Sequence, residues 1–202
     1  MKTLSATCSL GSGTLHFLRN GTGTGTVLFL HGISFTARIW EKAGILSELG
    51  SAGYHALAVD LPGYGDSTPL KVPDAELLLP VVETLNINRT VIIAPSFSGR
   101  FAVPFILDNP SRVEGFVSVA SRGIDLHQNR LHEMACPVLA VWGEKDDIIP
   151  LALADILVNA VPRGRKIIIP GGTHAPYLSD TGRFTRELLD FLKTCFNTPR
   201  PL

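Results

Sequence analysis

Three polar side chains, Ser96, Asp146 and His174, have the types and local contexts that nucleophilic catalysis by a serine requires. A serine hydroxyl is a weak nucleophile at neutral pH. It needs a neighbouring base, a group that orients the base, and hydrogen-bond donors for the oxyanion. Ser96 follows the apolar run "VIIAP" and opens an apolar helical run, which is the strand-turn-helix context of a nucleophile elbow. We therefore predict that Ser96 attacks an acyl carbonyl.

Two neighbouring serines compete for the nucleophile position, and the size of the residues around them separates the two. The sharp turn of an elbow brings together the residues two before and two after the nucleophile, so both must be small. Ser96 has Ala94 and Ser98 at these positions, whereas Ser98 would have Ser96 and Arg100. Because arginine is bulky, Ser96 is favoured, and Ser98 is expected to be a structural spacer.

The base and the acid are expected directly after two later strands. His174 lies in the glycine-rich segment "PGGTHAPYL", which follows the last apolar run. The segment "VLAVWGEKDDIIP" offers Glu144, Asp146 and Asp147 as the acid. The Gly-x-x-Asp spacing from Gly143 favours Asp146, but Asp147 stays open as an alternative.

Backbone N–H groups at two turns are expected to bind the oxyanion. One belongs to Phe97, the residue after the nucleophile, and the other to Ile33 in the segment "FLHGIS". The loops that hold these residues also suggest which side chains line the substrate pocket. The candidates for the pocket are His31, Gly32, Phe35, Tyr64, Arg122 and Tyr177.

Apolar, β-rich runs alternate with helical patterns along the chain, after a hairpin-like start whose turn is expected at "GTGTGT". This alternation predicts an α/β fold, a mostly parallel central sheet with helices on both faces. Pro80 is expected to break the second helix. The predicted strands are Thr26–His31, His55–Asp60, Val91–Ala94, Gly115–Ala120, Pro137–Trp142 and Arg165–Ile169. The predicted helices are Ile39–Ala52, Ala75–Leu85, Phe97–Leu107, Leu151–Asn159 and Thr181–Thr194.

No pattern in the sequence predicts a metal site or a dinucleotide site. The spacings of His127, His132 and Cys136 match no common zinc pattern, so we predict no metal. The glycines of "GTGTGT" precede a strand, whereas a dinucleotide-binding loop follows one.

The composition argues against two classes of partner. The 202 residues carry 18 Lys or Arg and 18 Asp or Glu, so they lack the basic excess typical of nucleic-acid or membrane-surface binding. The three cysteines show no C-x-x-C spacing, which indicates a cytoplasmic location, with the nucleus as an alternative. We expect a monomer with a single domain over residues 1–202, of which 197–202 form a flexible tail.

Several motifs together resemble the α/β-hydrolase superfamily over nearly the whole chain, namely "LFLHG", "AVDLPGYGDS", "APSFSG", "VWGEKDDIIP" and "GGTHAPYL". The runs "HGISFTARIW" and "LPGYGDS", and a Pro-Ser-x-Ser-Gly run followed by "FAVPFIL", are similar to the small, lidless CIB-like hydrolases. This resemblance implies the α/β-hydrolase fold, Ser96, Asp146 and His174 as the triad, and esterase or deacylase activity on short acyl groups. Ala94 and Ser98 stand where the superfamily has glycines, so the elbow should be the most crowded part of the site.

The expected substrate is small or carried on a larger molecule, because the chain has no room for a lid. Only sixteen residues, Ser121 to Cys136, separate two of the predicted strands. We predict a serine hydrolase without a cofactor, acting on a small acyl substrate or an acylated protein. The alternatives are a non-catalytic interaction or ligand-receptor module on the same fold, and an acyltransferase that passes an acetyl group to coenzyme A. The coenzyme A acceptor and a partner in the transcription machinery are implied by the resemblance alone.

Overall fold

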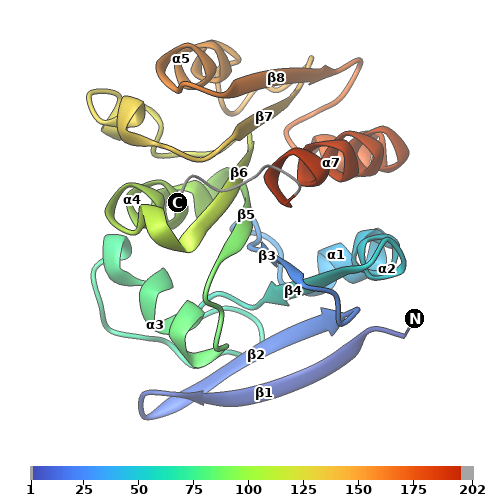
Figure 1. The fold of residues 1–202 in the computed structure, drawn as a ribbon, viewed down its shortest axis with the longest axis vertical. Coiled ribbons are helices and arrows are strands. Elements are labelled where there is room, and N and C mark those ends of the chain that lie inside the picture. The colour runs from blue at the N-terminus through green and yellow to red at the C-terminus, as the bar shows by residue number, and fades with distance from the viewer. Residues whose placement is uncertain (1, 197–202) are drawn as a thin grey trace.

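The computed structural model describes residues 2–196, in which eight strands form one twisted sheet (Figure 1). In their order across the sheet, the strands are β1 (Leu4–Leu10), β2 (Gly13–Asn20), β4 (Tyr54–Val59), β3 (Gly25–Phe29), β5 (Thr90–Pro95), β6 (Val113–Val119), β7 (Val138–Gly143) and β8 (Gly164–Ile169). The pairs β1–β2 and β2–β4 are antiparallel, and the other pairs are parallel. The prediction of a mostly parallel sheet is confirmed. The predicted tail at 197–202 lies outside the described residues.

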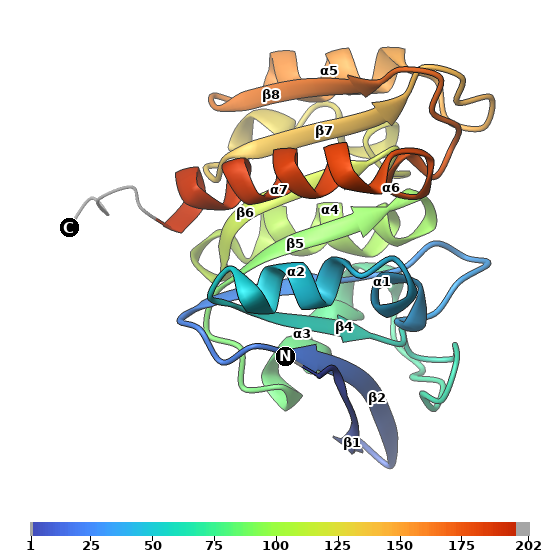
Figure 2. The same cartoon turned by 90° about the vertical axis from the view of Figure 1, so that its right-hand side faces the viewer.

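Helices cover both faces of this sheet, as predicted (Figure 2). One face carries α1 (Arg38–Lys42), α2 (Ile45–Ser51), α6 (Pro176–Ser179) and α7 (Thr181–Phe196). The other carries α3 (Leu78–Thr84), α4 (Gly99–Asp108) and α5 (Ala152–Ala160). Each face has its own hydrophobic core, one around Trp40 and Phe184 and the other around Phe105 and Trp142. Strands β5 and β7 are buried along their whole length because they lie between the two cores, which explains their continuous apolar sequences.

The expected hairpin turn at "GTGTGT" is wrong. Strand β2 forms its hairpin with β1, through a turn at Gly11, and its other neighbour is β4 rather than β3. The segment at "GTGTGT" instead carries the chain past the start of β4. A Cβ atom on Gly23 would lie only 1.6 Å from the carbonyl oxygen of Gly53, so the glycine there permits close contact between two backbones.

Three of the predicted helices differ from the observed ones at a specific residue. The predicted helix Ile39–Ala52 is two helices, because Gly44 adopts a left-handed backbone with φ +76° between α1 and α2. Pro80 lies in the first turn of α3, where its missing N–H costs no hydrogen bond, and a separate 3-10 turn, Asp74–Glu76, precedes it. The helix predicted from Phe97 begins at Gly99, after a 3-10 turn over Ser96–Ser98.

The connection between β6 and β7 holds two short 3-10 turns, Asp125–His127 and Leu131–Glu133, and no lid. No large insertion in this connection therefore covers the carboxyl ends of the parallel strands. No helix within residues 2–196 is both long enough and apolar enough to cross a membrane.

Candidate active site

Ser96 occupies the turn between β5 and α4 in a strained backbone conformation. Its φ is +48°, in the left-handed region that residues other than glycine rarely adopt. The neighbouring Ser98 is fully buried, and its Oγ donates a hydrogen bond to the carbonyl oxygen of Pro95 at 2.9 Å. Ser98 thus stabilises the turn, whereas the side chain of Ser96 projects into a cavity.

The segment after β6 packs closely against this turn. Ser121 Oγ donates to the carbonyl oxygen of Ala94 at 2.6 Å, and the Arg122 N–H donates to the carbonyl oxygen of Ser96 at 2.8 Å. A Cβ atom on Gly99 would lie 2.3 Å from the carbonyl oxygen of Arg122, so only glycine allows this approach. The backbone on both sides of Ser96 is therefore held in place.

A chain of hydrogen bonds joins the three side chains predicted as the triad. Ser96 Oγ lies 2.8 Å from His174 Nε2, and His174 Nδ1 lies 2.9 Å from Asp146 Oδ2. Since an ionised carboxylate only accepts hydrogen bonds, Nδ1 carries the ring proton, and Nε2 is left to accept from the Ser96 hydroxyl. This is the arrangement in which an imidazole can remove the serine proton.

Asp146, and not Asp147, is the carboxylate that meets His174. The Asp146 side chain is 1% exposed, and its Oδ1 also accepts hydrogen bonds from the N–H groups of Ile148 and Ile149, at 2.9 and 3.0 Å. Asp147 is exposed. Glu144 accepts a hydrogen bond from the Gly171 N–H at 2.7 Å, so it braces the loop that leads to His174.

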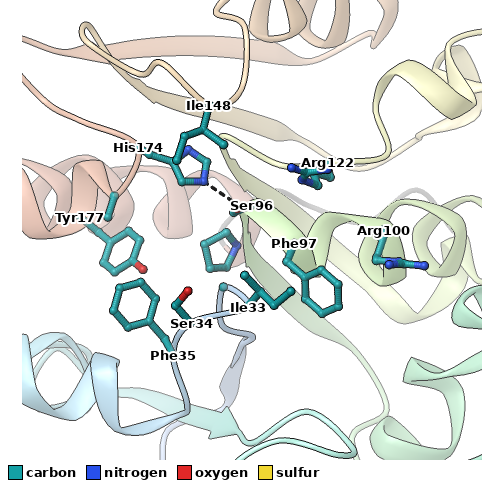
Figure 3. A pocket seen from close by; sticks show the side chains of 13 residues that line it. Ile33, Ser34, Phe35, Ser96, Phe97, Arg100, Arg122, Ile148, His174 and Tyr177 are labelled. Atoms are coloured by element: carbon teal, nitrogen blue, oxygen red, sulfur yellow. Dashed lines mark hydrogen bonds between the residues drawn. The ribbon is translucent and has the colours of Figure 1, made fainter.

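A cavity of about 370 Å³ opens beside Ser96 and His174 (Figure 3). Six residues predicted for the oxyanion hole or the pocket line it, namely Gly32, Ile33, Phe35, Phe97, Arg122 and Tyr177. Sequence reasoning missed Ser34, Pro95, Arg100, Ile148 and Ala175. Each of these lies within four residues of a predicted site residue, so proximity in sequence was the available signal.

The cavity has an aromatic end built from Phe35 and Tyr177. Tyr177 is 2% exposed and packs against Trp40, with 4.6 Å between the ring centroids and the ring planes tilted by 33°. Burial raises the pKa of the Tyr177 phenol above its usual range, so this hydroxyl stays neutral.

In the loop after β3, the N–H of Ile33 has no hydrogen-bond acceptor within the described part of the chain. It is available to a ligand.

The predictions that His31 and Tyr64 line the pocket are wrong. His31 is fully buried, with Nε2 accepting from the Leu61 N–H at 3.0 Å and Nδ1 donating to the carbonyl oxygen of Gly32 at 2.9 Å. Burial lowers its pKa, so the ring is neutral and supports the loop that carries Ile33. Tyr64 packs against His31, with 5.4 Å between the ring centroids, and is not among the residues that line the cavity.

A second Ser–His–Asp chain occurs at the β1–β2 edge and was not foreseen. Ser5 Oγ lies 2.8 Å from His16 Nε2, and His16 Nδ1 lies 2.8 Å from Asp60 Oδ2. Asp60 also accepts the N–H of Ala37 at 2.7 Å, in the loop after β3. Ser5 belongs to a regular strand and does not line the cavity beside Ser96. This chain therefore braces the loop after β3.

The same cluster is the one grouping of possible metal ligands among the described residues. His16, Asp60 and Asp66 each offer an atom within 4.8 Å of the others. The atoms concerned on His16 and Asp60 are already hydrogen-bonded to each other, and Asp60 Oδ2 also accepts the Asp66 N–H at 3.0 Å. These contacts account for the cluster without an ion.

Comparison with known proteins places this chain in a hydrolase family. The family described as alpha/beta hydrolase fold matches residues 25–135. The chain is 37% identical over 179 residues to Protein ABHD14A of Danio rerio, covering 82% of this chain but only 63% of the relative's length. It is 33% identical over 182 residues to a human protein named "Putative protein-lysine deacylase ABHD14B", covering 86% of each. Among solved structures, a "predicted CIB-like hydrolase" from Thermoplasma acidophilum has a TM-score of 0.90 at 24% identity, covering 96% of this chain and 99% of that one. That likeness concerns the fold.

Proposed function

Since the chain belongs to the alpha/beta hydrolase family, we propose that it is a serine hydrolase that cleaves small acyl esters or acyl-amides through an acyl-enzyme intermediate. The observation that carries this proposal is the unbroken hydrogen-bond chain from Asp146 through His174 to Ser96, beside an open cavity. Substrate reaches the serine without displacing a lid.

In the proposed mechanism, Ser96 Oγ attacks the acyl carbonyl carbon while its proton moves to His174 Nε2. Asp146 holds the imidazole in the correct tautomer and stabilises the imidazolium that forms. The N–H groups of Ile33 and Phe97 bind the negative oxygen of the tetrahedral intermediate, each contributing about 3 kcal/mol to transition-state stabilisation. His174 then returns the proton to the leaving group. Water attacks the acyl-enzyme while His174 Nε2 takes its proton, and His174 gives that proton to Ser96 Oγ as the bond between Ser96 and the acyl group breaks.

The substrate that we favour is a short acyl group carried on a larger molecule. Two features support this choice, the absence of a lid between β6 and β7 and the name of the human relative, which describes a protein-lysine deacylase. An acylated protein lysine is therefore our proposed substrate. Transfer of the acyl group to coenzyme A stays a prediction of the sequence resemblance.

The first test is turnover of p-nitrophenyl acetate by the wild-type protein, Ser96→Ala and Ser5→Ala. Ser96→Ala should abolish turnover, because Ser96 Oγ is the hydroxyl that lies within hydrogen-bonding distance of His174 Nε2. Ser5→Ala is the matched control, since Ser5 has the same hydrogen-bonding pattern but lies at the β1–β2 edge. Equal residual turnover in the wild type and Ser96→Ala would defeat the assignment.

The second test identifies the activated serine without knowledge of the substrate. A fluorophosphonate probe should add one label to the intact protein, and peptide mapping should place it on Ser96 and not on Ser5. An unlabelled protein that nevertheless binds acylated peptides would instead favour the non-catalytic binding module.

A further inference from the structure

We propose that Arg122 selects acyl groups that end in a carboxylate, so that the enzyme prefers the half-esters or half-amides of short dicarboxylic acids. This inference rests on the proposed function, because it concerns the acyl group that Ser96 would accept. It goes further by naming the chemistry at the far end of that group.

Arg122 stands at the border between two cavities. One is the cavity of about 370 Å³ beside Ser96, and the other, of about 450 Å³, extends toward α5. Both are lined by Arg100 and Arg122, and by no other shared residue. A substrate that extends from Ser96 toward the second cavity must pass these two guanidinium groups.

The two arginines differ in whether their charge is already neutralised. Arg100 forms an ion pair with Asp74, and its guanidinium lies over the rings of Phe97 and Phe101, at 5.3 and 5.6 Å from their centroids. Arg122 is exposed, and no carboxylate in residues 2–196 lies within ion-pair distance of it. Asp125 also lines the second cavity but forms no such pair. Arg122 is thus the guanidinium at this border that can bind an anion.

The backbone of Arg122 is fixed relative to the nucleophile. Its N–H donates to the carbonyl oxygen of Ser96 at 2.8 Å, and its carbonyl oxygen packs against Gly99. A planar guanidinium can bind a carboxylate through two parallel hydrogen bonds, which is stronger and more selective than binding a neutral amide. The fixed backbone limits the distance from Ser96 at which this carboxylate can be held, so it favours short acyl chains.

The direction of the acyl chain follows from the position of the base. His174 must return its proton to the leaving group, so the leaving group lies on the His174 side of Ser96. Tyr177 and Phe35 lie on that side, and Arg122 lies on the opposite side of Ser96 (Figure 3). The acyl chain therefore extends toward Arg122, and an anion at its end meets the guanidinium.

The test compares two esters that differ only at the end of the acyl chain. Monomethyl glutarate ends in a carboxylate, and its terminal amide, methyl glutaramate, is neutral. In the wild type, kcat/KM should be about tenfold higher for the carboxylate. In Arg122→Gln the ratio of the two values should fall to about one, and Arg122→Lys should retain part of the preference. Arg38→Gln, an exposed arginine on α1 that lines neither cavity, is the charge-matched control and should keep the full preference.

A third ester distinguishes the acyl side from the leaving-group side. Acetoxyacetate carries its carboxylate on the leaving group, so Arg122→Gln should not lower its kcat/KM relative to that of methyl acetate. A wild-type preference for the neutral glutarate derivative, a preference that survives Arg122→Gln, or a selective loss with acetoxyacetate would each overturn the proposal.

A binding measurement separates this proposal from the proposed function. Titration of Ser96→Ala with monomethyl glutarate, followed by NMR, should show saturable binding about tenfold tighter than that of methyl glutaramate, and the double variant with Arg122→Gln should lose the difference. If this discrimination is present but no ester is turned over, the Arg122 inference stands and the catalytic proposal fails. If esters are turned over but this discrimination is absent, the catalytic proposal stands and the Arg122 inference fails.

Discussion

At the scale of single residues, the protein contains two Ser–His–Asp chains with nearly the same hydrogen-bond lengths. Ser96 and Ser5 both lie 2.8 Å from the Nε2 atom of a histidine. They differ in backbone and surroundings, because Ser96 has a φ of +48° at a turn beside a cavity, whereas Ser5 belongs to an edge strand. Hydrogen bonding orients a base, but access to a substrate comes from the backbone around the serine.

The two adjacent aspartates provide a test at this scale. Asp146→Asn should lower kcat for p-nitrophenyl acetate by roughly three to four orders of magnitude, because the amide can present the wrong hydrogen-bonding group to His174 Nδ1. Asp147→Asn changes an exposed side chain of the same size and charge and should leave kcat within about twofold of wild type. Steady-state kinetics of both variants decide the matter, and a similar loss in the two would contradict the assignment of the acid.

At the scale of elements, the site is assembled from loops that follow β3, β5, β6, β7 and β8. The turn between α1 and α2 illustrates how one residue sets the path of an element. Gly44 has φ +76°, and a Cβ atom there would meet no atom within 4 Å. Space is therefore available, and only the backbone conformation requires glycine.

A pair of glycine variants isolates this backbone effect. Gly44→Ala should destabilise the protein by about 1 kcal/mol, since alanine is strained in the left-handed region. Gly182→Ala, in the first turn of α7, should stabilise it by about 0.5 kcal/mol, because a Cβ atom there makes only ordinary contacts, the nearest at 3.7 Å. Urea unfolding monitored by circular dichroism measures both changes. A gain in stability for Gly44→Ala would show that φ is not positive there in solution.

At the scale of the whole molecule, the sheet separates two hydrophobic cores and buries titratable groups in both. Burial lowers the pKa of His31 and His55, and it raises the pKa of the Cys136 and Cys195 thiols to about 12. In each case the charged form is disfavoured, because the group is removed from water. Folding is therefore linked to pH and to thiol chemistry.

The histidines predict how stability changes with pH. The unfolded chain takes up protons as the pH falls through the ordinary histidine value of 6.5, whereas folded His31 and His55 resist protonation. Because the unfolded state then binds more protons, the free energy of unfolding should be highest above this pH. It should fall as the pH is lowered toward 5.5. Urea titrations between pH 7.5 and 5.5 measure it. A rise in stability over this range would contradict the predicted direction.

The cysteines predict the pattern of thiol labelling. In the folded protein, iodoacetamide should modify Cys8 first, because Cys8 is only partly buried, while the buried Cys136 and Cys195 should react far more slowly. All three should react quickly in urea. Mass spectrometry over time counts the labels, and Cys8→Ser should remove the early one. Rapid labelling of all three thiols in the native protein would contradict the buried cores.

The sequence alone determined the elements with continuous local patterns. The apolar runs that became β3 to β7 were each recognisable, because a strand buried on both faces needs apolar residues along its length. The edge strand β8 was recognisable from the apolar residues in its second half. Ser96 could be placed at a turn after β5, and His174 after β8, from their immediate neighbours. The pairing of β2 could not be predicted from the sequence, because β4 comes to lie between β2 and β3 only when distant segments meet.

Only the tertiary structure decided which side chains face one another. It placed Asp146 rather than the adjacent Asp147 against His174, although Asp146 and His174 are 28 residues apart in the sequence. It also enclosed His31 behind the pocket wall and left Arg122 exposed between two cavities. Secondary structure follows from the local sequence, but the direction of a loop side chain depends on contacts between segments far apart in the chain, which local patterns do not contain.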